Sequence, residues 1–167
     1  MPLTPDIVIR QPTWADAPAI EAMFARCSPE SRYARFLAPL VAVPPEHLSG
    51  ILGSCAKNAA WVGVMSDRPD TVLALGSWSR DGSEAELALI VEDSWQRRGI
   101  GSKLLRTIAD GAWNAGVCRL TASVLTESKH VFRMLRAVLG PTSARADGYV
   151  SHVTSDRCDD PEFAPTR

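Results

Sequence analysis

The sequence predicts a mixed β-sheet with helices packed against it, a fold of the α/β or α+β class. Three observations indicate this class. Apolar residues follow helical spacing before residue 60 and mostly alternate after it. An Asp-Gly pair at 81–82 separates two alternating runs, which is typical of an antiparallel hairpin. The second of these runs, Glu84–Val91, leads through a glycine-bearing turn into a long amphipathic helix.

One strand and two helices are predicted before residue 60. Thr13 and Asp16 have the spacing of a capping box, so we expect a helix to begin there. This helix would place three apolar side chains on one face: Ile20, Met23 and Phe24. A strand is expected before this helix, at 6–10, and the helix itself should end near Ser28-Pro29. A proline-bounded stretch at 31–36 and a helix from Pro44 to Leu52 should follow.

Strands predominate after residue 60, with two more helices between them. The expected strands are 61–65, 72–78, 84–91, 119–125 and 149–154, and a turn at 67–70 separates the first two. The expected helices are 99–115, which ends at Gly116, and 128–138. The longer helix should bury one face, because four apolar residues follow helical spacing: Leu104, Leu105, Ile108 and Ala112.

The chain of 167 residues fits one domain, 1–167, better than two. We expect its core to span about 6–155 and the polar, proline-containing tail at 156–167 to be loose. With 46% hydrophobic and 22% charged residues, the composition is that of a globular protein. The net charge of −1 gives no general attraction to nucleic acid or to an anionic membrane, so neither is an expected partner.

No segment predicts export or membrane insertion. The first six residues lack the basic start and apolar core of a signal peptide, and no apolar run is long enough to span a bilayer. None of the three histidines has ligand spacing, and the four cysteines form no CxxC pair; they are Cys27, Cys55, Cys118 and Cys158. We therefore expect a cytoplasmic protein with reduced thiols and no metal site.

The loop between the Glu84–Val91 strand and the long helix is the strongest candidate for a binding site. The first N–H groups of a helix have no internal partners, and the helix dipole adds partial positive charge there. Gly99 and Gly101 would let the backbone approach a phosphate. Three basic side chains could add charge-assisted contacts: Arg97, Arg98 and Lys103. The spacing is neither that of a dinucleotide fingerprint nor that of a P-loop, and a Gly-x-Gly alone also fits a simple tight turn.

The run E-L-A-L-I-V-E-D-S-W-Q-R-R-G-I-G-S-K-L-L at 86–105 resembles motif A of the GNAT acetyltransferases, in which Gln/Arg-x-x-Gly-x-Gly/Ala follows a strand. Gln96, Gly99 and Gly101 match that pattern, and the resemblance extends over about 6–155. It implies acetyl-CoA as co-substrate. Its pyrophosphate would be held by Gln96, Arg97, Arg98, Gly99, Ile100, Gly101 and Ser102.

The resemblance also implies the GNAT fold, a mixed, mostly antiparallel sheet that is splayed between its fourth and fifth strands and flanked by helices. A bulge in the strand at 84–91 is expected to part it from the strand at 119–125. The pantetheine arm would pair with main-chain groups near Leu89 and Val91. Ser128, where the family often has asparagine, would either bind the pantetheine or cap its helix.

Transfer to an amine requires a base, because an amine such as lysine, with a pKa of about 10.4, is almost fully protonated at neutral pH. Glu86 matches the position at which many GNAT enzymes carry a catalytic glutamate, and we predict it to be the general base. A solvated strand carboxylate is the alternative. Leu135 stands where a tyrosine usually protonates the leaving thiolate, so Tyr33, Tyr149 or water would take that role.

The stretch C-S-P-E-S-R-Y-A-R-F at 27–36, taken with motif A, resembles the catalytic domain of bacterial protein-lysine acetyltransferases, in a chain too short for the regulatory regions joined to it there. Three functions stay open: acetylation of a protein lysine, acetylation of a small amine such as an antibiotic, polyamine or amino acid, and acyl-CoA binding without turnover. Arg32 and Arg35 of this stretch would form either solvated surface or an acceptor contact. A homodimer, common in the family, is an open expectation.

Overall fold

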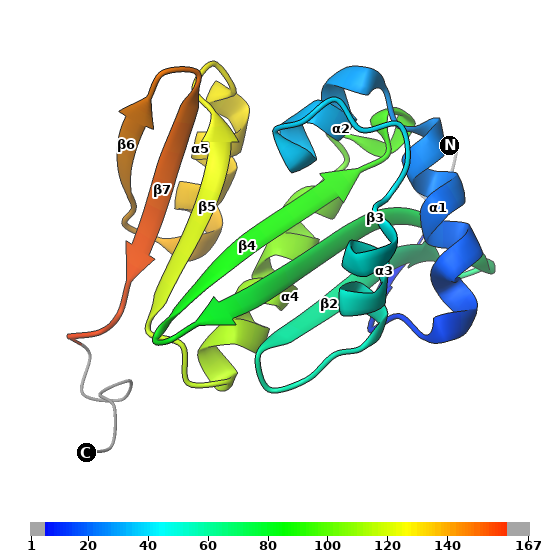
Figure 1. Cartoon of the computed structure of the whole chain (residues 1–167), viewed down its shortest axis with the longest axis horizontal. Coiled ribbons are helices and arrows are strands. Elements are labelled where there is room, and N and C mark those ends of the chain that lie inside the picture. Colours follow the sequence, from blue (N-terminus) through cyan, green and yellow to red (C-terminus); the bar gives the residue numbers. More distant parts are fainter. Residues whose placement is uncertain (1–5, 160–167) are drawn as a thin grey trace.

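The computed structural model describes residues 6–159, which form one seven-stranded sheet with helices on both faces (Figure 1). The strand order is β1-β2-β3-β4-β5-β7-β6. The strands are β1 Ile7–Arg10, β2 Asn58–Met65, β3 Arg68–Asp81, β4 Glu84–Val91, β5 Arg119–Leu125, β6 Ser143–Asp147 and β7 Val150–Asp156. The helices are α1 Ala17–Arg26, α2 Pro29–Phe36, α3 Pro45–Leu52, α4 Ile100–Asn114 and α5 Lys129–Leu139, with the short 3-10 helices η1 Trp14–Asp16 and η2 Asp93–Trp95.

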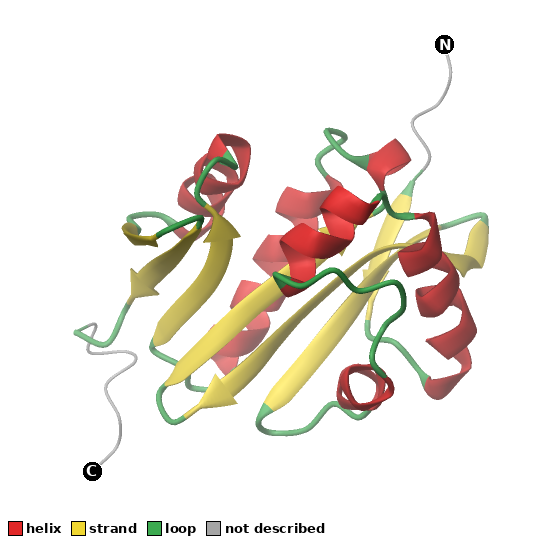
Figure 2. Cartoon of the chain, turned by 45° about the horizontal axis from the view of Figure 1, so that its top comes forward, coloured by secondary structure: helices red, strands yellow, loops and turns green. Residues whose placement is uncertain are grey.

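Two cores lie on opposite faces of the sheet. Figure 2 shows α4 behind the sheet and the helices of the first 52 residues in front of it. The face of α4 predicted to be buried is buried, namely Leu104, Leu105, Ile108 and Ala112. On the other side α1 buries the predicted Ile20, Met23 and Phe24. The mixed sheet flanked by helices is therefore confirmed, and apolar periodicity identified the faces that drive its packing.

The sheet is splayed between β4 and β5, as predicted, but the expected bulge in β4 is wrong. The two strands pair in parallel only from Glu84–Glu86 to Arg119–Thr121 and then diverge (Figure 1). The register of β3 with β4 runs unbroken from Ala74↔Val91 to Asp81↔Glu84. Because β4 stays paired with β3 along its whole length, it is β5 that leaves, and β5 pairs instead with β7 at seven positions. The register shifts lie in β2–β3, near Gly63–Met65.

Two predictions about the strands are corrected. The turn expected at 67–70 is shorter, because β3 already begins at Arg68. The strand β6 was not predicted at all. Every residue of Ser143–Asp147 is exposed, so this edge strand has no apolar alternation to reveal it. Asp147-Gly148, an Asp-Gly pair like the one at 81–82 with Gly148 at φ +63°, is the turn signal that could have found it.

The expectation of four reduced thiols is wrong for one pair. Cys118 and Cys158 form a disulfide with a Cα–Cα distance of 4.7 Å, which joins the residue before β5 to the chain just after β7. Neighbouring strands bring them together, because Arg119 pairs with Asp156 in the β5–β7 ladder. The tail expected to be loose from residue 156 is thus anchored at its start, and residues 160–167 lie outside the described part. Within the described chain, no helix is both long and apolar enough to cross a membrane.

Candidate active site

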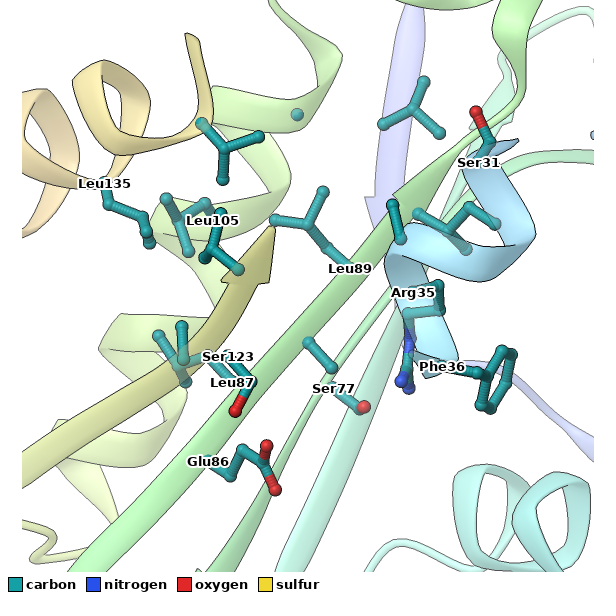
Figure 3. A pocket seen from close by; sticks show the side chains of 18 of the residues that line it. Ser31, Arg35, Phe36, Ser77, Glu86, Leu87, Leu89, Leu105, Ser123 and Leu135 are labelled. Atoms are coloured by element: carbon teal, nitrogen blue, oxygen red, sulfur yellow. The ribbon is translucent and has the colours of Figure 1, made fainter. Parts of the chain in front are cut away.

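A cleft of about 950 Å³ lies where β4 and β5 diverge, and its walls come from both faces of the sheet (Figure 3). One part, the loop half, is lined by the turn before α4, the first turn of α4 and the start of α5. The other part, the α2 half, is lined by α2, α3 and the adjoining residues of β3 and β4. Both halves belong to one continuous cavity, so a ligand bound in the loop half can reach residues of the α2 half.

The loop half is built on the N-terminus of α4. Gly99 is the residue preceding the helix, with φ +81°, and it offers no side chain to cap the helix. The first intrahelical bond there is Lys103 N to Gly99 O at 3.0 Å. The N–H groups of Ile100, Gly101 and Ser102 consequently have no acceptor within the helix. A fifteen-residue helix also directs the positive end of its dipole to this point, so an anion is favoured here.

Gly101 lies where the start of α4 meets β4 and α5, and its lack of a side chain leaves space there. A Cβ placed on Gly101 would lie 3.3 Å from Met134 Sδ, 3.8 Å from Val91 Cγ2 and 4.0 Å from Leu89 Cδ1. The space over Gly101 is therefore the narrow end of the gap between the splayed elements. A ligand that passes from the α4 N-terminus along β4 needs this space empty.

The basic side chains of the loop point in different directions. Arg97 lines the cleft, and it contributes, after burial, to lowering the pKa of His130, which lines the same half. Arg97 thus brings positive charge to this half of the cleft, which Glu127 also lines. Arg98 instead lies over the Trp95 ring, with its guanidinium carbon 4.9 Å from the ring centroid. Lys103 Nζ donates to Ile7 O at 2.6 Å. Arg98 and Lys103 were expected at the phosphate, but neither lines the cleft, and both line a separate small hollow beside Ile7 and Trp95.

Ile100 and Ser128, two further predicted cofactor residues, differ in what they can offer. The Ile100 side chain is buried in the core and does not line the cleft, so Ile100 can offer a ligand no more than its N–H at the helix start. Ser128 precedes α5 and lines the cleft, and its side chain makes no capping hydrogen bond. Its hydroxyl is therefore able to bind a ligand, whereas Ser102 contributes from the first turn of α4.

The main chain of β4 faces the gap at Leu89 and Val91. Glu92 N donates to Leu73 O at 2.9 Å, so Leu73 and Glu92 are a hydrogen-bonded pair that continues the β3–β4 register. Such pairs alternate with non-hydrogen-bonded ones in an antiparallel ladder, which makes Leu89 and Val91 non-hydrogen-bonded toward β3. Their N–H and C=O groups point to the side from which β5 has diverged. This strip is suited to pairing with an extended amide-bearing ligand.

Gln96 and Asp93 join this strip to α2. Gln96 Nε2 donates to Val91 O at 3.0 Å and to Ser31 Oγ at 3.1 Å. The Asp93 carboxylate accepts from Ser28 N at 2.8 Å, Ser28 Oγ at 2.7 Å and Ser31 Oγ at 2.8 Å. The Gln96 amide, predicted to hold the cofactor, is therefore engaged by the protein itself. Sequence reasoning did not identify Asp93, whose partners lie more than 60 residues away.

Glu86 lies on the face of β4 that looks toward α2. Ala85 and Leu87 pack in the core under α4, so the alternating residues Glu86 and Ala88 face the other side. Glu86 pairs with Ser79 of β3 and is exposed to the cleft. Figure 3 shows its carboxylate on the cleft floor, close to Ser77. A carboxylate in this place can exchange a proton with a ligand in the α2 half.

Neither tyrosine lines the cleft among the described residues, and Leu135 does. Leu135 is buried in the core beside the gap and carries no proton to donate. Tyr33 of α2 interacts with the hydroxyl of Tyr149, in the turn between β6 and β7, and this raises the pKa of Tyr33. The two tyrosines thus interact with each other, and neither belongs to the lining of the cavity.

Arg35 and His47 form a contact in the α2 half. An Arg35 Nη donates to His47 Nε2 at 3.0 Å, and the guanidinium lies over the Phe36 ring at 4.7 Å. Burial lowers the pKa of Arg35 to about 10, which Glu86 opposes by Coulomb attraction. Burial and the charge of Arg35 lower the pKa of His47 to about 4. At neutral pH the guanidinium is therefore charged and the imidazole neutral.

The splayed sheet, the free amides at the start of α4 and the open main-chain strip of β4 define the acetyltransferase class of α/β folds. The chain belongs to one family of that class, since the model of the Acetyltransferase (GNAT) family matches residues 18–140. It is a GNAT acetyltransferase. A search of curated protein sequences gave no match.

Solved structures of GNAT proteins share this fold. The GNAT domain of S. lividans PAT is 23% identical, with a TM-score of 0.78 over 89% of each chain. The structure of yncA, a putative acetyltransferase from Salmonella typhimurium with its cofactor acetyl-CoA, is 18% identical, with a TM-score of 0.72 over 96% of this chain and 98% of that one. A GCN5-related N-acetyltransferase from Kribbella flavida is 20% identical, with a TM-score of 0.66 over 89% and 95%. At these identities the likeness concerns the fold alone.

Proposed function

We propose that this chain transfers an acetyl group from acetyl-CoA to a primary amine, with Glu86 as the general base. The single observation that carries the proposal is the continuity of the cleft, which joins the free amides of α4 to the Glu86 carboxylate. A pyrophosphate suits the N–H groups of Ile100, Gly101 and Ser102, with Arg97 beside them. The pantetheine amides suit the outward-facing N–H and C=O of Leu89 and the N–H of Val91, whose C=O already accepts from Gln96 Nε2. The Ser128 hydroxyl also lines the cleft.

The chain's own residues would act on the amine. An ammonium held in the α2 half gives one proton to the Glu86 carboxylate, directly or through water. The freed nitrogen pair forms a C–N bond to the acetyl carbonyl carbon, and the C–S bond breaks with its electron pair going to sulfur. The acylated nitrogen then gives its second proton to water, the thiolate takes up one proton, and Glu86 releases its own proton to solvent. The net change is R–NH₃⁺ plus acetyl-CoA to the acetamide, CoA–SH and one proton.

The proton for the thiolate comes from water in this proposal. Leu135 cannot supply it, and Tyr33 and Tyr149 lie outside the cleft lining. A thiol has a pKa near 8.5, so a thiolate is a fair leaving group without an acid beside it. Because no tyrosine is among the residues that line the cleft, a second candidate function is an acyl-CoA-binding module without turnover.

Calorimetry with acetyl-CoA and turnover with a good amine acceptor separate the two candidates. Binding that is lost when Gly99 and Gly101 are both replaced by bulkier residues supports the cofactor site. For Glu86→Gln we expect unchanged binding of acetyl-CoA and a fall in kcat of about 100-fold or more, the usual contribution of a general base. Binding without turnover on any amine would favour the non-catalytic module. Unchanged turnover in Glu86→Gln would make Glu86 a solvated carboxylate.

The acceptor is proposed here only as a primary amine. A protein lysine is supported by the likeness to the GNAT domain of S. lividans PAT and by the stretch at 27–36, which forms α2 and its cap. A small amine is supported by the walls of the α2 half, to which both α2 and α3 contribute residues. Turnover on a lysine-containing peptide, compared with a panel of small amines at equal concentration, decides between them.

A further inference from the structure

Arg35 is a largely desolvated cation that forms no close ion pair among the described residues, although Glu86 attracts it at longer range. It lies on α2 and points into the cleft, toward Ser77 on the floor (Figure 3). Protein surrounds it closely enough to lower its pKa markedly, yet part of its side chain remains accessible from the cleft. Four ion pairs are formed within residues 6–159, and none of them includes Arg35. A desolvated charge of this kind is costly unless an opposite charge is supplied.

The contacts of Arg35 hold the guanidinium without neutralising it. His47 Nε2 accepts one N–H, and because a guanidinium only donates, the neutral His47 must carry its own proton on Nδ1. The Phe36 ring covers one face of the guanidinium, and Phe36 is itself braced edge-on by Phe24 and His47. These contacts leave further N–H donors of a five-donor fork directed at the cleft. The fork is fixed in position, and its natural complement is a carboxylate bound in bidentate fashion.

The α2 half is lined by charges of both signs. Glu86 lies on the cleft floor, and the exposed carboxylates Glu30 and Glu46 line the same half. Arg35 supplies the opposite charge from α2. The three carboxylates would attract a polyamine, but a polyamine has no group that could pair with the guanidinium. An acceptor with an ammonium and a carboxylate can satisfy both groups at once.

We infer that Arg35 is the receptor for a carboxylate of the acyl acceptor, so that the substrate is a small amino acid-type molecule with a primary amine and a carboxylate. This inference rests on the proposed acetyl transfer to an amine. The ammonium lies toward Glu86, and the carboxylate pairs with the free N–H groups of Arg35. Arg35 thereby selects the acceptor and orients its nitrogen, while His47 and Phe36 keep the guanidinium in place.

The test compares acceptors that differ only in the carboxylate. Amino acids are paired with their decarboxylated amines, for example phenylalanine with phenethylamine, and spermidine and a lysine peptide with blocked ends complete the panel. We expect the best acceptor to carry a carboxylate and to exceed its decarboxylated partner by about 100-fold in kcat/KM, as expected for loss of one partner of a buried charge pair. Acceptor binding is also measured by calorimetry in the presence of CoA, apart from turnover.

The variants assign this preference to Arg35. Arg35→Gln should lower kcat/KM for the carboxylate acceptor about 100-fold, mainly through KM, and leave the decarboxylated amine within about threefold. Arg35→Lys keeps the charge without the fork and should lie in between. Arg106→Gln, on the exposed face of α4, is the matched control and should change neither. Acetyl-CoA binding should be the same in all three variants, and thermal melts establish that each is folded.

The outcomes of the two proposals are separable. The role of Arg35 is refuted if the protein binds acetyl-CoA but prefers spermidine, the blocked peptide or decarboxylated amines, and if Arg35→Gln changes nothing. The proposed acetyl transfer would then still stand. A protein that does not bind acetyl-CoA overturns the proposed function. In that case calorimetry with amino acids alone still reports on Arg35, and equal binding by wild type and Arg35→Gln would refute its role.

Discussion

Replacing Gly101 by alanine tests whether the gap at the start of α4 is the path of the cofactor. The added methyl would lie 3.3 Å from Met134 Sδ, a tight contact with a flexible side chain, and 3.8 and 4.0 Å from Val91 and Leu89. Alanine in a helix is favoured over glycine by up to about 1 kcal/mol. Moving the flexible Met134 costs about 1 kcal/mol, the low end of the range for overpacking. The free energy of unfolding should therefore change by no more than about 1 kcal/mol.

Ligand binding should change far more than stability in this variant. The methyl occupies the space through which a chain would run from the pyrophosphate to the β4 main chain. Loss of one charge-assisted hydrogen bond, about 1.5–3 kcal/mol, corresponds to a roughly 10- to 100-fold rise in Kd for acetyl-CoA. Gly101→Val should exceed this. Calorimetry gives Kd, and thermal melts give the stability.

Gly99→Ala should behave in the opposite way, with a change in stability and little change in the Kd for acetyl-CoA. Nothing lies within 4 Å of a Cβ at Gly99, but its φ of +81° strains an alanine. We expect a loss of about 1 kcal/mol of stability, a fall in Tm of roughly 2–4 °C, without narrowing of the gap. If a folded Gly101→Val bound acetyl-CoA with the wild-type Kd, the cofactor could not follow this path, and our account of the loop half would be wrong.

Two further predictions concern the cysteines and His47. A maleimide should label only the exposed Cys55 in the native protein, because Cys27 is buried and burial raises its pKa to about 11; denaturation should add Cys27, and reduction should add Cys118 and Cys158. Mass spectrometry counts the labels, and four labels without a reductant would exclude the disulfide. For His47, the pKa is about 4 in the folded state and about 6.5 unfolded, so the unfolded chain takes up the proton first as the pH falls. The contribution of His47 is complete above pH 6.5 and declines toward pH 4, by about 1–2 kcal/mol when its partial exposure is allowed for. Urea denaturation gives the free energy of unfolding at pH 7 and at pH 5. The drop between these two pH values should be smaller in His47→Gln than in wild type, and an equal drop would mean that other groups cause it.

Local sequence signals were enough for most of the elements. The strand Glu84–Val91 and the strand Arg119–Leu125 were predicted with the bounds that the structure has. The long helix differs by one residue at each end, and its apolar face is the buried one. These features depend on side-chain periodicity and on turn residues within a few positions of one another. The edge strand Ser143–Asp147 escaped because a strand exposed along its whole length leaves no periodicity to detect.

The candidate site divides in the same way. The glycine loop and Glu86 could be found from the sequence because they lie in one continuous stretch of 86–101. The directions of the side chains could not. Arg97 faces the cleft whereas its neighbour Arg98 lies over Trp95, since Arg97 adopts a φ of +61° that redirects the chain between them. The assignment of Gln96 to Val91 O and Ser31 Oγ likewise required the folded position of α2.

The sequence by itself determined the sheet with its two helical faces, the glycine loop at the start of α4 and the family resemblance, because each is encoded in short-range spacing. Only the tertiary structure decided which residues face one another across long separations. Cys118 reaches Cys158 over 40 residues through the β5–β7 ladder, and Arg35 reaches His47 and the Glu86 side of the cleft by the packing of α2 and α3. Such contacts follow from the burial of whole faces against the sheet, a property of the complete chain that no local pattern contains.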